Sequence, residues 1–191
     1  MEILQVAAGV AILALPVIGL IWMLRRASRR REAISNAYRA FADRYGLRFA
    51  SPMPFPMLEG QVDGRKLVLG NFRHPKNPQV FEFRMALGLR GFDADTIITR
   101  KGLLDTSDVN TGDAWFDKKV VVKTKYVDAV RAYLLPDRIA AIREVVEAGL
   151  GSGIIGGQIL LQRQKDYRAR AEWFEANLAK LRQWAARLDA A

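Results

Sequence analysis

The longest uninterrupted apolar stretch of the chain lies at its beginning. Residues 3–24 contain no charged side chain, and residues 25–31 then carry five arginines. A helix rises about 1.5 Å per residue, so the apolar run would extend roughly 33 Å, enough to cross a hydrocarbon core of about 30 Å. We therefore predict a transmembrane anchor over residues 1–24, followed by a basic juxtamembrane segment and helix over residues 25–50.

The position of the arginines predicts the topology of this anchor. Arginine close to a span stays on the cytoplasmic side, so we expect a single-pass inner (plasma) membrane protein with its N-terminus outside and the bulk of the chain cytoplasmic. A cleaved signal peptide is disfavoured because the positive charge follows the apolar run instead of preceding it. We expect the lipid bilayer to be a partner, contacted at its surface by Arg25, Arg26, Arg29, Arg30 and Arg31.

A second hydrophobic pattern follows the arginines. One apolar stripe with spacings of four, three and four predicts a helix over residues 31–45, and Gly46 suits a left-handed C-cap. Residues 51–56 then carry three prolines, which predict an extended connection into the main domain, residues 51–191. The stripe consists of Ile34, Tyr38, Phe41 and Tyr45.

Alternating and β-branched stretches predict a series of strands. Residues 57–62 and 65–72 flank an Asp-Gly pair, which is the signal of a type I′ hairpin turn. Residues 80–89 alternate between apolar and polar side chains, and we expect residues 94–100 to form their antiparallel neighbour. The remaining strands are expected over residues 118–125 and 154–161.

Helical patterns dominate the end of the chain. Pro136 and Asp137 suit the first turn of a helix that runs to Ala148, and residues 163–188 predict a long C-terminal helix. Strands that cluster together between helices are typical of the α+β class. We therefore predict one domain with a mostly antiparallel sheet packed by helices.

The long C-terminal helix carries an apolar seam, spaced alternately four and three residues apart over three heptads. Two interpretations stay open. The seam packs on the sheet of its own domain, or residues 164–191 form an interface for self-association or for a protein partner. Trp173 and Trp184 lie off the seam and would either widen the packed face or meet a partner. The seam consists of Tyr167, Ala171, Phe174, Leu178, Leu181, Ala185 and Leu188.

The balance of charges is strongly positive, with a formal net charge of +10. All 30 lysines and arginines follow Leu24, and the arginines of residues 25–31 account for about half of the excess. A nucleic-acid partner is therefore not needed to explain the charge, and the lysines around residues 118–125 are expected to lie at a solvated sheet edge. The absence of cysteine excludes disulfides, thiol catalysis and the usual zinc clusters.

No stretch of the chain forms a catalytic signature. Residues 151–156 match G-x-G-x-x-G, but a helix precedes them and a strand follows, which reverses the dinucleotide-binding context. We expect a tight turn there and no cofactor. Residues 93–117 carry six aspartates, yet an EF-hand beginning at Asp108 lacks the required glycine and glutamate. We therefore expect turn chemistry and no metal site.

Residues 111–122 resemble a G-[DN]-x-x-F-D-x-x-[FV]-x-V stretch of several uncharacterised bacterial membrane-protein families. In those families a leucine-rich segment, a proline and a helix follow, as they do here from residues 134–136 onward. The resemblance covers roughly residues 105–150. It implies a bacterial, membrane-associated protein of unknown function, and it implies no site residues. In physical terms, Phe116 would fill the end of the sheet and Asp117 would cap a turn.

These observations favour a non-catalytic role. We expect the chain to be a membrane-anchored cytoplasmic interaction or scaffold domain, with no catalytic residue identified. Two alternatives stay open: a metal-dependent enzyme that uses the Asp-rich loop of residues 105–117, and nucleic-acid binding through the basic sheet edge. Aspartates that converge in a cleft would favour the enzyme, whereas aspartates spread over separate turns would favour the interaction domain.

Overall fold

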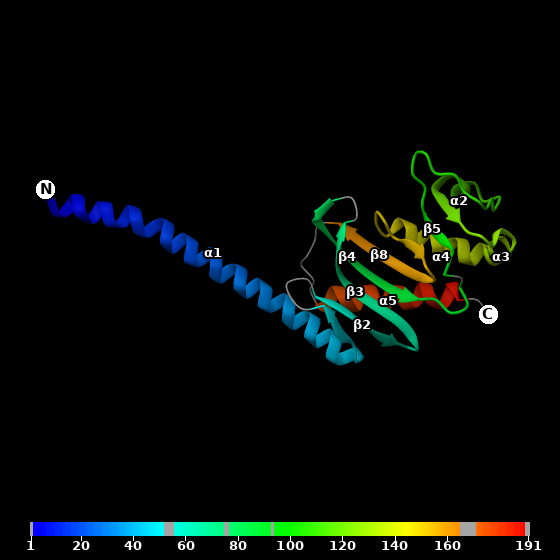
Figure 1. The fold of residues 1–191 in the computed structure, drawn as a ribbon, viewed down its shortest axis with the longest axis horizontal. Coiled ribbons are helices and arrows are strands. Elements are labelled where there is room, and N and C mark those ends of the chain that lie inside the picture. Colours follow the sequence, from blue (N-terminus) through cyan, green and yellow to red (C-terminus); the bar gives the residue numbers. More distant parts are fainter. Residues whose placement is uncertain (1, 52–55, 75–76, 93, 165–170, 190–191) are drawn as a thin grey trace.

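The computed structural model of the chain describes residues 2–51, 56–74, 77–92, 94–164 and 171–189 (Figure 1). Within these ranges the side chains are described except at residues 2–18, 30–31, 51, 73–74, 77–81, 163–164 and 171. The helices are α1 (Glu2–Tyr45), α2 (Ala114–Lys119), α3 (Val127–Tyr133), α4 (Pro136–Glu147) and α5 (Ala171–Leu188). The strands are β1 (Arg48–Ser51), β2 (Met57–Val62), β3 (Arg65–His74), β4 (Asn77–Gly88), β5 (Ile97–Arg100), β6 (Val120–Lys123), β7 (Gly153–Ile155) and β8 (Gln158–Gln164).

The described strands form one antiparallel sheet in the order β1-β2-β3-β4-β8-β7-β5-β6. The β2–β3 hairpin turns at Asp63 and Gly64, whose φ angles of 54° and 71° are those of the predicted type I′ turn. Strands and helices are segregated along the chain instead of alternating. The α+β class with an antiparallel sheet is therefore confirmed.

The strand neighbours differ from the prediction in the second half of the sheet. Residues 94–100 were expected beside β4, but β8 occupies that edge of β4, and β5 pairs with β7 and β6. The predicted strand over residues 154–161 is two strands, because Gly156 and Gly157 adopt φ angles of 61° and 71° and reverse the chain between β7 and β8. These pairings join segments far apart in sequence, so local patterns do not report them.

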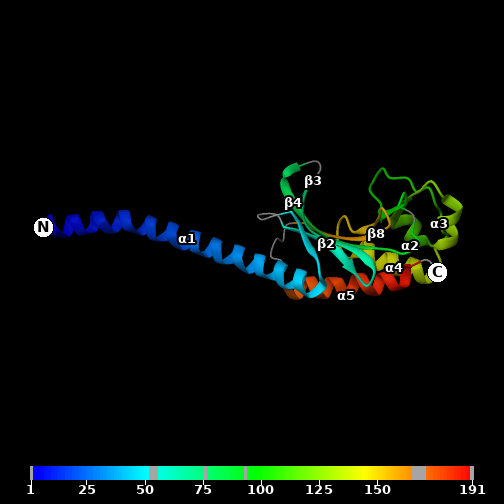
Figure 2. The same cartoon turned by 60° about the horizontal axis from the view of Figure 1, so that its bottom comes forward.

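Helices α1, α4 and α5 cover one face of the sheet, with α5 lying directly beneath it (Figure 2). The apolar seam of α5 points into this layer, and its described members are fully buried. Trp184 is also buried, and Trp173 packs edge-on against Phe83 at 4.7 Å between ring centroids. The seam therefore belongs to the core of its own domain. Its described members are Phe174, Leu178, Leu181, Ala185 and Leu188; Tyr167 lies outside the described residues, as does the side chain of Ala171.

Helix α1 is much longer than its contact with the domain. Its 44 residues extend about 66 Å, and it projects away from the sheet (Figure 1). Among the described side chains of α1, the first buried one is Tyr38, which meets Phe174 of α5 at 4.9 Å between ring centroids. The described side chains between residues 19 and 33 are all exposed.

The predicted transmembrane anchor needs correction. Across the residues that the structure describes, no helix combines the length and the apolarity needed to cross a membrane. The described apolar side chains at the start of α1 run only from Leu20 to Leu24 before Arg25 follows, and the side chains of residues 2–18 lie outside the described residues. This finding contradicts the N-terminal transmembrane helix and the single-pass placement with its N-terminus outside, and the assignment of the bulk of the chain to the cytoplasm loses the span on which it was based.

The C-terminal end of α5 is fastened to the rest of the domain by a charged cluster. The Arg65 guanidinium donates two hydrogen bonds to the Asp189 carboxylate, one of them 2.6 Å long, and the Arg90 N–H donates a third at 3.0 Å. The Tyr133 hydroxyl donates to the Leu188 carbonyl. Burial alone would raise the pKa of Asp189, but the Arg65 and Arg90 contacts outweigh it and hold that pKa below its ordinary value.

We expect Asp189→Asn to lower the free energy of unfolding at pH 7 by about 1.5–3 kcal/mol, because a charge-assisted bidentate contact is lost. The folded-state pKa of Asp189 is lowered. This contribution to stability is therefore complete above the ordinary carboxyl pKa of about 3.9, and it is lost as the pH falls from there through the lowered folded-state pKa. Chemical denaturation at pH 7 and pH 3.5 measures both effects. Asp128→Asn, whose carboxylate is 96% exposed, is the matched control; equal losses in both variants would contradict the fastening role.

Candidate functional site

The aspartates of residues 93–117 are spread over separate turns. Asp95 pairs with Lys125 at 2.9 Å, and the Asp105 carboxylate accepts a hydrogen bond from the Gly102 N–H at 2.7 Å. Asp108 accepts from the Thr124 N–H at 3.0 Å and pairs with Lys123, contacts that lower its pKa. Within the described ranges, no group of three or more acidic or histidine side chains could hold a metal ion. Asp93 lies outside the described residues.

The G-D-x-x-F-D stretch is a local folding unit. Asp117 accepts hydrogen bonds from the Thr111 N–H and hydroxyl and from the Gly112 N–H, each 2.9 Å long. Asp113 caps α2 by accepting from the Phe116 N–H at 2.8 Å. Phe116 is 1% exposed and belongs to the core. The roles expected for Phe116 and Asp117 are therefore confirmed. The strand predicted from residue 118 begins only at Val120, because residues 118 and 119 belong to the short helix α2.

The basic residues of the sheet edge are partly neutralised by the same turns. Lys123 and Lys125 hold ion pairs to Asp108 and Asp95, and the Lys101 ammonium donates to the Asp117 carbonyl at 3.2 Å. Lys123 and Lys125 are thus paired with carboxylates of these turns, whereas Lys118 and Lys119, just before β6, are exposed. Nucleic-acid binding through this edge stays a prediction.

The arginines expected to contact a membrane surface lie on the projecting part of α1. Arg25, Arg26 and Arg29 are exposed, and the Arg26 guanidinium stacks over the Trp22 ring at 5.0 Å. The side chains of Arg30 and Arg31 lie outside the described residues. The described arginines follow each other along one exposed helix without meeting side chains of the folded domain, so they do not combine with it into a site.

A groove of about 550 Å³ lies between the end of α4 and the first half of α5. Its described lining contains no carboxylate, histidine or hydroxyl group, and the Asn177 amide is directed to the Trp173 carbonyl at 2.7 Å. The nearby G-x-G-x-x-G stretch is a turn with close packing, because a Cβ at Gly153 would lie 2.4 Å from the Ile98 carbonyl oxygen. The groove therefore offers an apolar wall and little chemistry.

Two leucines stand out at the tip of the loop between β5 and α2. Leu103 and Leu104 are 105% and 96% exposed, whereas the other exposed leucines of the folded domain, Leu135 and Leu150, are 54% and 62% exposed. The loop projects from the β5–β6 end of the sheet (Figure 1). The sequence patterns predicted no helix or strand between residues 100 and 118, and they did not point to this pair. The available signal was two adjacent leucines with no apolar partner at strand or helix spacing.

The leucine tip is held by a braced loop. On its first side the Lys101 N–H donates to the Lys119 carbonyl at 2.8 Å, and the Asp105 carboxylate closes the turn onto Gly102. On its second side the Ser107 hydroxyl accepts from the Val122 N–H at 3.1 Å and donates to the Val109 carbonyl at 2.8 Å. We call residues 100–109, together with Lys118 and Lys119, the leucine tip surface.

These features define an antiparallel α+β domain with a protruding, braced apolar loop. Searches against protein-family models, curated proteins and solved structures find no match to the chain. The resemblance over residues 105–150 to uncharacterised bacterial membrane-protein families therefore stays a prediction.

We expect Asp117→Asn to lower the free energy of unfolding by about 1–3 kcal/mol. An amide offers one acceptor oxygen in place of two, so its NH₂ group would face either the Gly112 N–H or the Thr111 donors. Thermal or denaturant unfolding of the purified chain measures this. Asp128→Asn again serves as the exposed control, and wild-type stability of Asp117→Asn would argue against a structural role for this carboxylate.

Phe116→Ala should lower the free energy of unfolding by about 3–5 kcal/mol, because it removes a fully buried ring from the end of the core. Trp115→Ala is the neighbouring comparison, since Trp115 is only partly buried and stacks on the Arg143 guanidinium at 4.4 Å. A smaller loss for Phe116→Ala than for Trp115→Ala would contradict the packing described here.

Proposed function

We propose that the chain is a non-catalytic interaction module that presents its leucine tip surface to another protein. The observation that carries the proposal is the near-complete exposure of Leu103 and Leu104 at the end of a braced loop. Single exposed apolar residues are common. Two adjacent ones at full exposure, in a domain that buries most of its other described leucines, are better explained by burial against a partner.

The bracing of the loop supports the same role. Its hydrogen bonds to Lys119, Val122 and Thr124 fix the loop before any partner arrives. A surface that is already ordered loses less conformational entropy on binding, which leaves more of the burial energy as affinity. Full burial of one leucine side chain contributes about 1.5–3 kcal/mol, so the two together are enough to anchor a moderate interface.

The distribution of the aspartates argues against the enzymatic alternative. The described carboxylates of residues 95–117 accept backbone hydrogen bonds, cap α2 or pair with lysines, and they do so in different turns. Their contacts thus support a role in folding. At this end of the domain, Leu103 and Leu104 are apolar side chains that the fold leaves exposed.

Site-specific photo-crosslinking tests the proposal. A photoreactive amino acid at the exposed Thr106 reports on contacts beside the tip while both leucines remain open to substitution. In extracts of cells that make the protein, we expect one discrete protein adduct that Leu103→Ser with Leu104→Ser reduces by more than tenfold. Because both leucines are exposed, the double variant should unfold within about 0.5 kcal/mol of the wild type.

Leu150→Ser, with the same reporter at Thr106, is the matched control, since Leu150 is an exposed leucine next to the groove and away from the tip. It should leave the adduct unchanged. An adduct whose yield is indifferent to the tip leucines, or the lack of any saturable adduct, would contradict the proposed function.

A further inference from the structure

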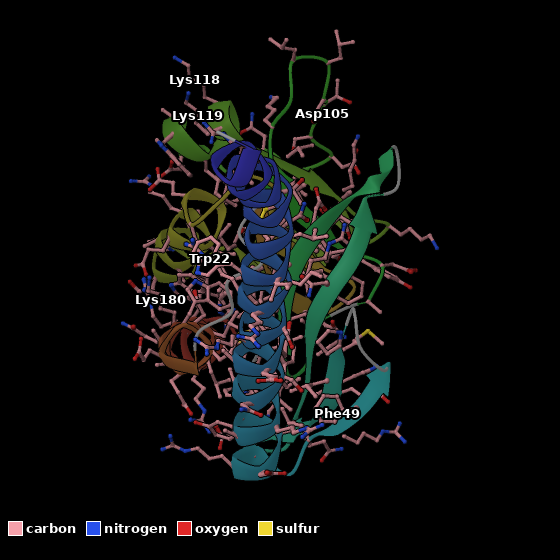
Figure 3. The ribbon with its side chains drawn as sticks, turned by 90° about the vertical axis from the view of Figure 1, so that its left-hand side faces the viewer. Trp22, Phe49, Asp105, Lys118, Lys119 and Lys180 are labelled. Carbon is pink, nitrogen blue, oxygen red and sulfur yellow. The ribbon has the colours of Figure 1, made fainter. Side chains whose placement is uncertain are left out.

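The charges around the leucine tip are arranged asymmetrically. Figure 3 shows Lys118 and Lys119 on one side of this end of the molecule and Asp105 on the other. Arg100, Lys118 and Lys119 are exposed, and no ion pair joins any of them to another described residue. Near the tip, the cations without an ion pair to a described residue therefore lie together on one flank. We call Arg100, Lys118 and Lys119 the cationic flank.

The backbone holds this cationic flank against the base of the leucine loop. In the β5–β6 pairing Arg100 lies opposite Val120, the residue that follows Lys119 in the chain. The Lys101 N–H donates a hydrogen bond to the Lys119 carbonyl at 2.8 Å. Lys101 is two residues before Leu103. The two leucines and the flank therefore form one surface with a fixed internal geometry.

We infer that the partner is a protein with a pocket for the two leucine side chains and with aspartate or glutamate along the rim that meets Arg100, Lys118 and Lys119. This inference rests on the proposed function and names the chemistry of the partner. Complementary charges of this kind accelerate encounter and fix the register of an interface. The carboxylate of Asp105 on the opposite flank would instead meet a neutral or basic part of the rim.

The same asymmetry separates a protein partner from other anionic surfaces. A flat anionic lipid surface would face the Asp105 carboxylate together with the lysine flank, so one part of the contact would be repulsive. A nucleic acid would leave the two leucines without an apolar counterpart, since its affinity comes chiefly from phosphate contacts. A protein pocket can match an apolar tip, a basic flank and an acidic flank at once.

Carbodiimide coupling provides the test, because it joins a lysine amine to a carboxylate only when the two are in contact. We expect the complex detected through the Thr106 reporter to be coupled at Lys118 or Lys119, with peptide mapping locating the bond on a partner aspartate or glutamate. Lys118→Arg with Lys119→Arg keeps the charge but removes the amines, so it should retain the photo-adduct and lose the carbodiimide product.

Charge reversal gives the second arm. Lys118→Glu with Lys119→Glu should reduce the photo-adduct by about tenfold or more at low salt, because like charges would then face each other. Lys180→Glu, a reversal on α5 far from the tip (Figure 3), should leave it unchanged. Added salt should weaken the wild-type adduct, because it screens the attraction between the flank and the partner's carboxylates, and it should weaken the residual adduct of the reversed variant less.

The outcomes separate this inference from the function on which it rests. A photo-adduct that depends on the leucines but survives charge reversal would overturn the acidic rim and leave the interaction module standing. An adduct that contains lipid or nucleic acid and no peptide would overturn the protein partner. Circular dichroism of each variant, compared with the wild type, confirms that a lost adduct does not reflect a lost fold.

Discussion

The arrangement of the domain depends on the packing of Phe174, which joins helix α5 to helix α1 and to strand β4 of the sheet. Its ring meets Tyr38 of α1 edge-on at 4.9 Å, Phe41 at 5.3 Å and Phe83 of β4 at 5.8 Å between centroids. One side chain of α5 therefore fixes the end of the long helix and the centre of the sheet together. Aromatic contacts of this geometry add to the stabilisation that their buried area supplies. In the sheet, β8 and β7 separate β4, on which Phe174 packs, from β5 and β6, so the β5–β6 end lies far from this aromatic cluster.

The remote end is stabilised in a different way. Around residues 100–125 the buried side chains are few and small apart from Phe116, and hydrogen bonds that backbone N–H groups donate to carboxylates hold the turns. A loop held by polar contacts can keep its shape while its tip stays exposed. Phe116 at this end and Phe174 belong to one hydrophobic cluster, whereas Leu103 and Leu104 at the tip of the loop lie outside it.

Local patterns predicted the elements better than their arrangement. The heptad seam marked the residues of α5 that are buried, and the Asp-Gly pair marked the turn between β2 and β3, because both depend on neighbours a few residues away. The pairing of β4 with β8 joins segments about 75 residues apart, and no period reports it. The apolar run of residues 3–24 predicted a membrane span that the described residues do not support.

The leucine tip was missed for a related reason. A pattern search looks for apolar residues that recur with a partner, and Leu103 and Leu104 have none within the chain. That isolation is itself the physical clue, since folding gives neither leucine a place to be buried. Asp117 and Phe116 belong to the more conspicuous motif, yet Asp117 accepts hydrogen bonds from its own loop and Phe116 is buried in the core. The side chains that fold this loop differ from the two leucines of the proposed interface, so substitutions at the leucines can separate binding from stability.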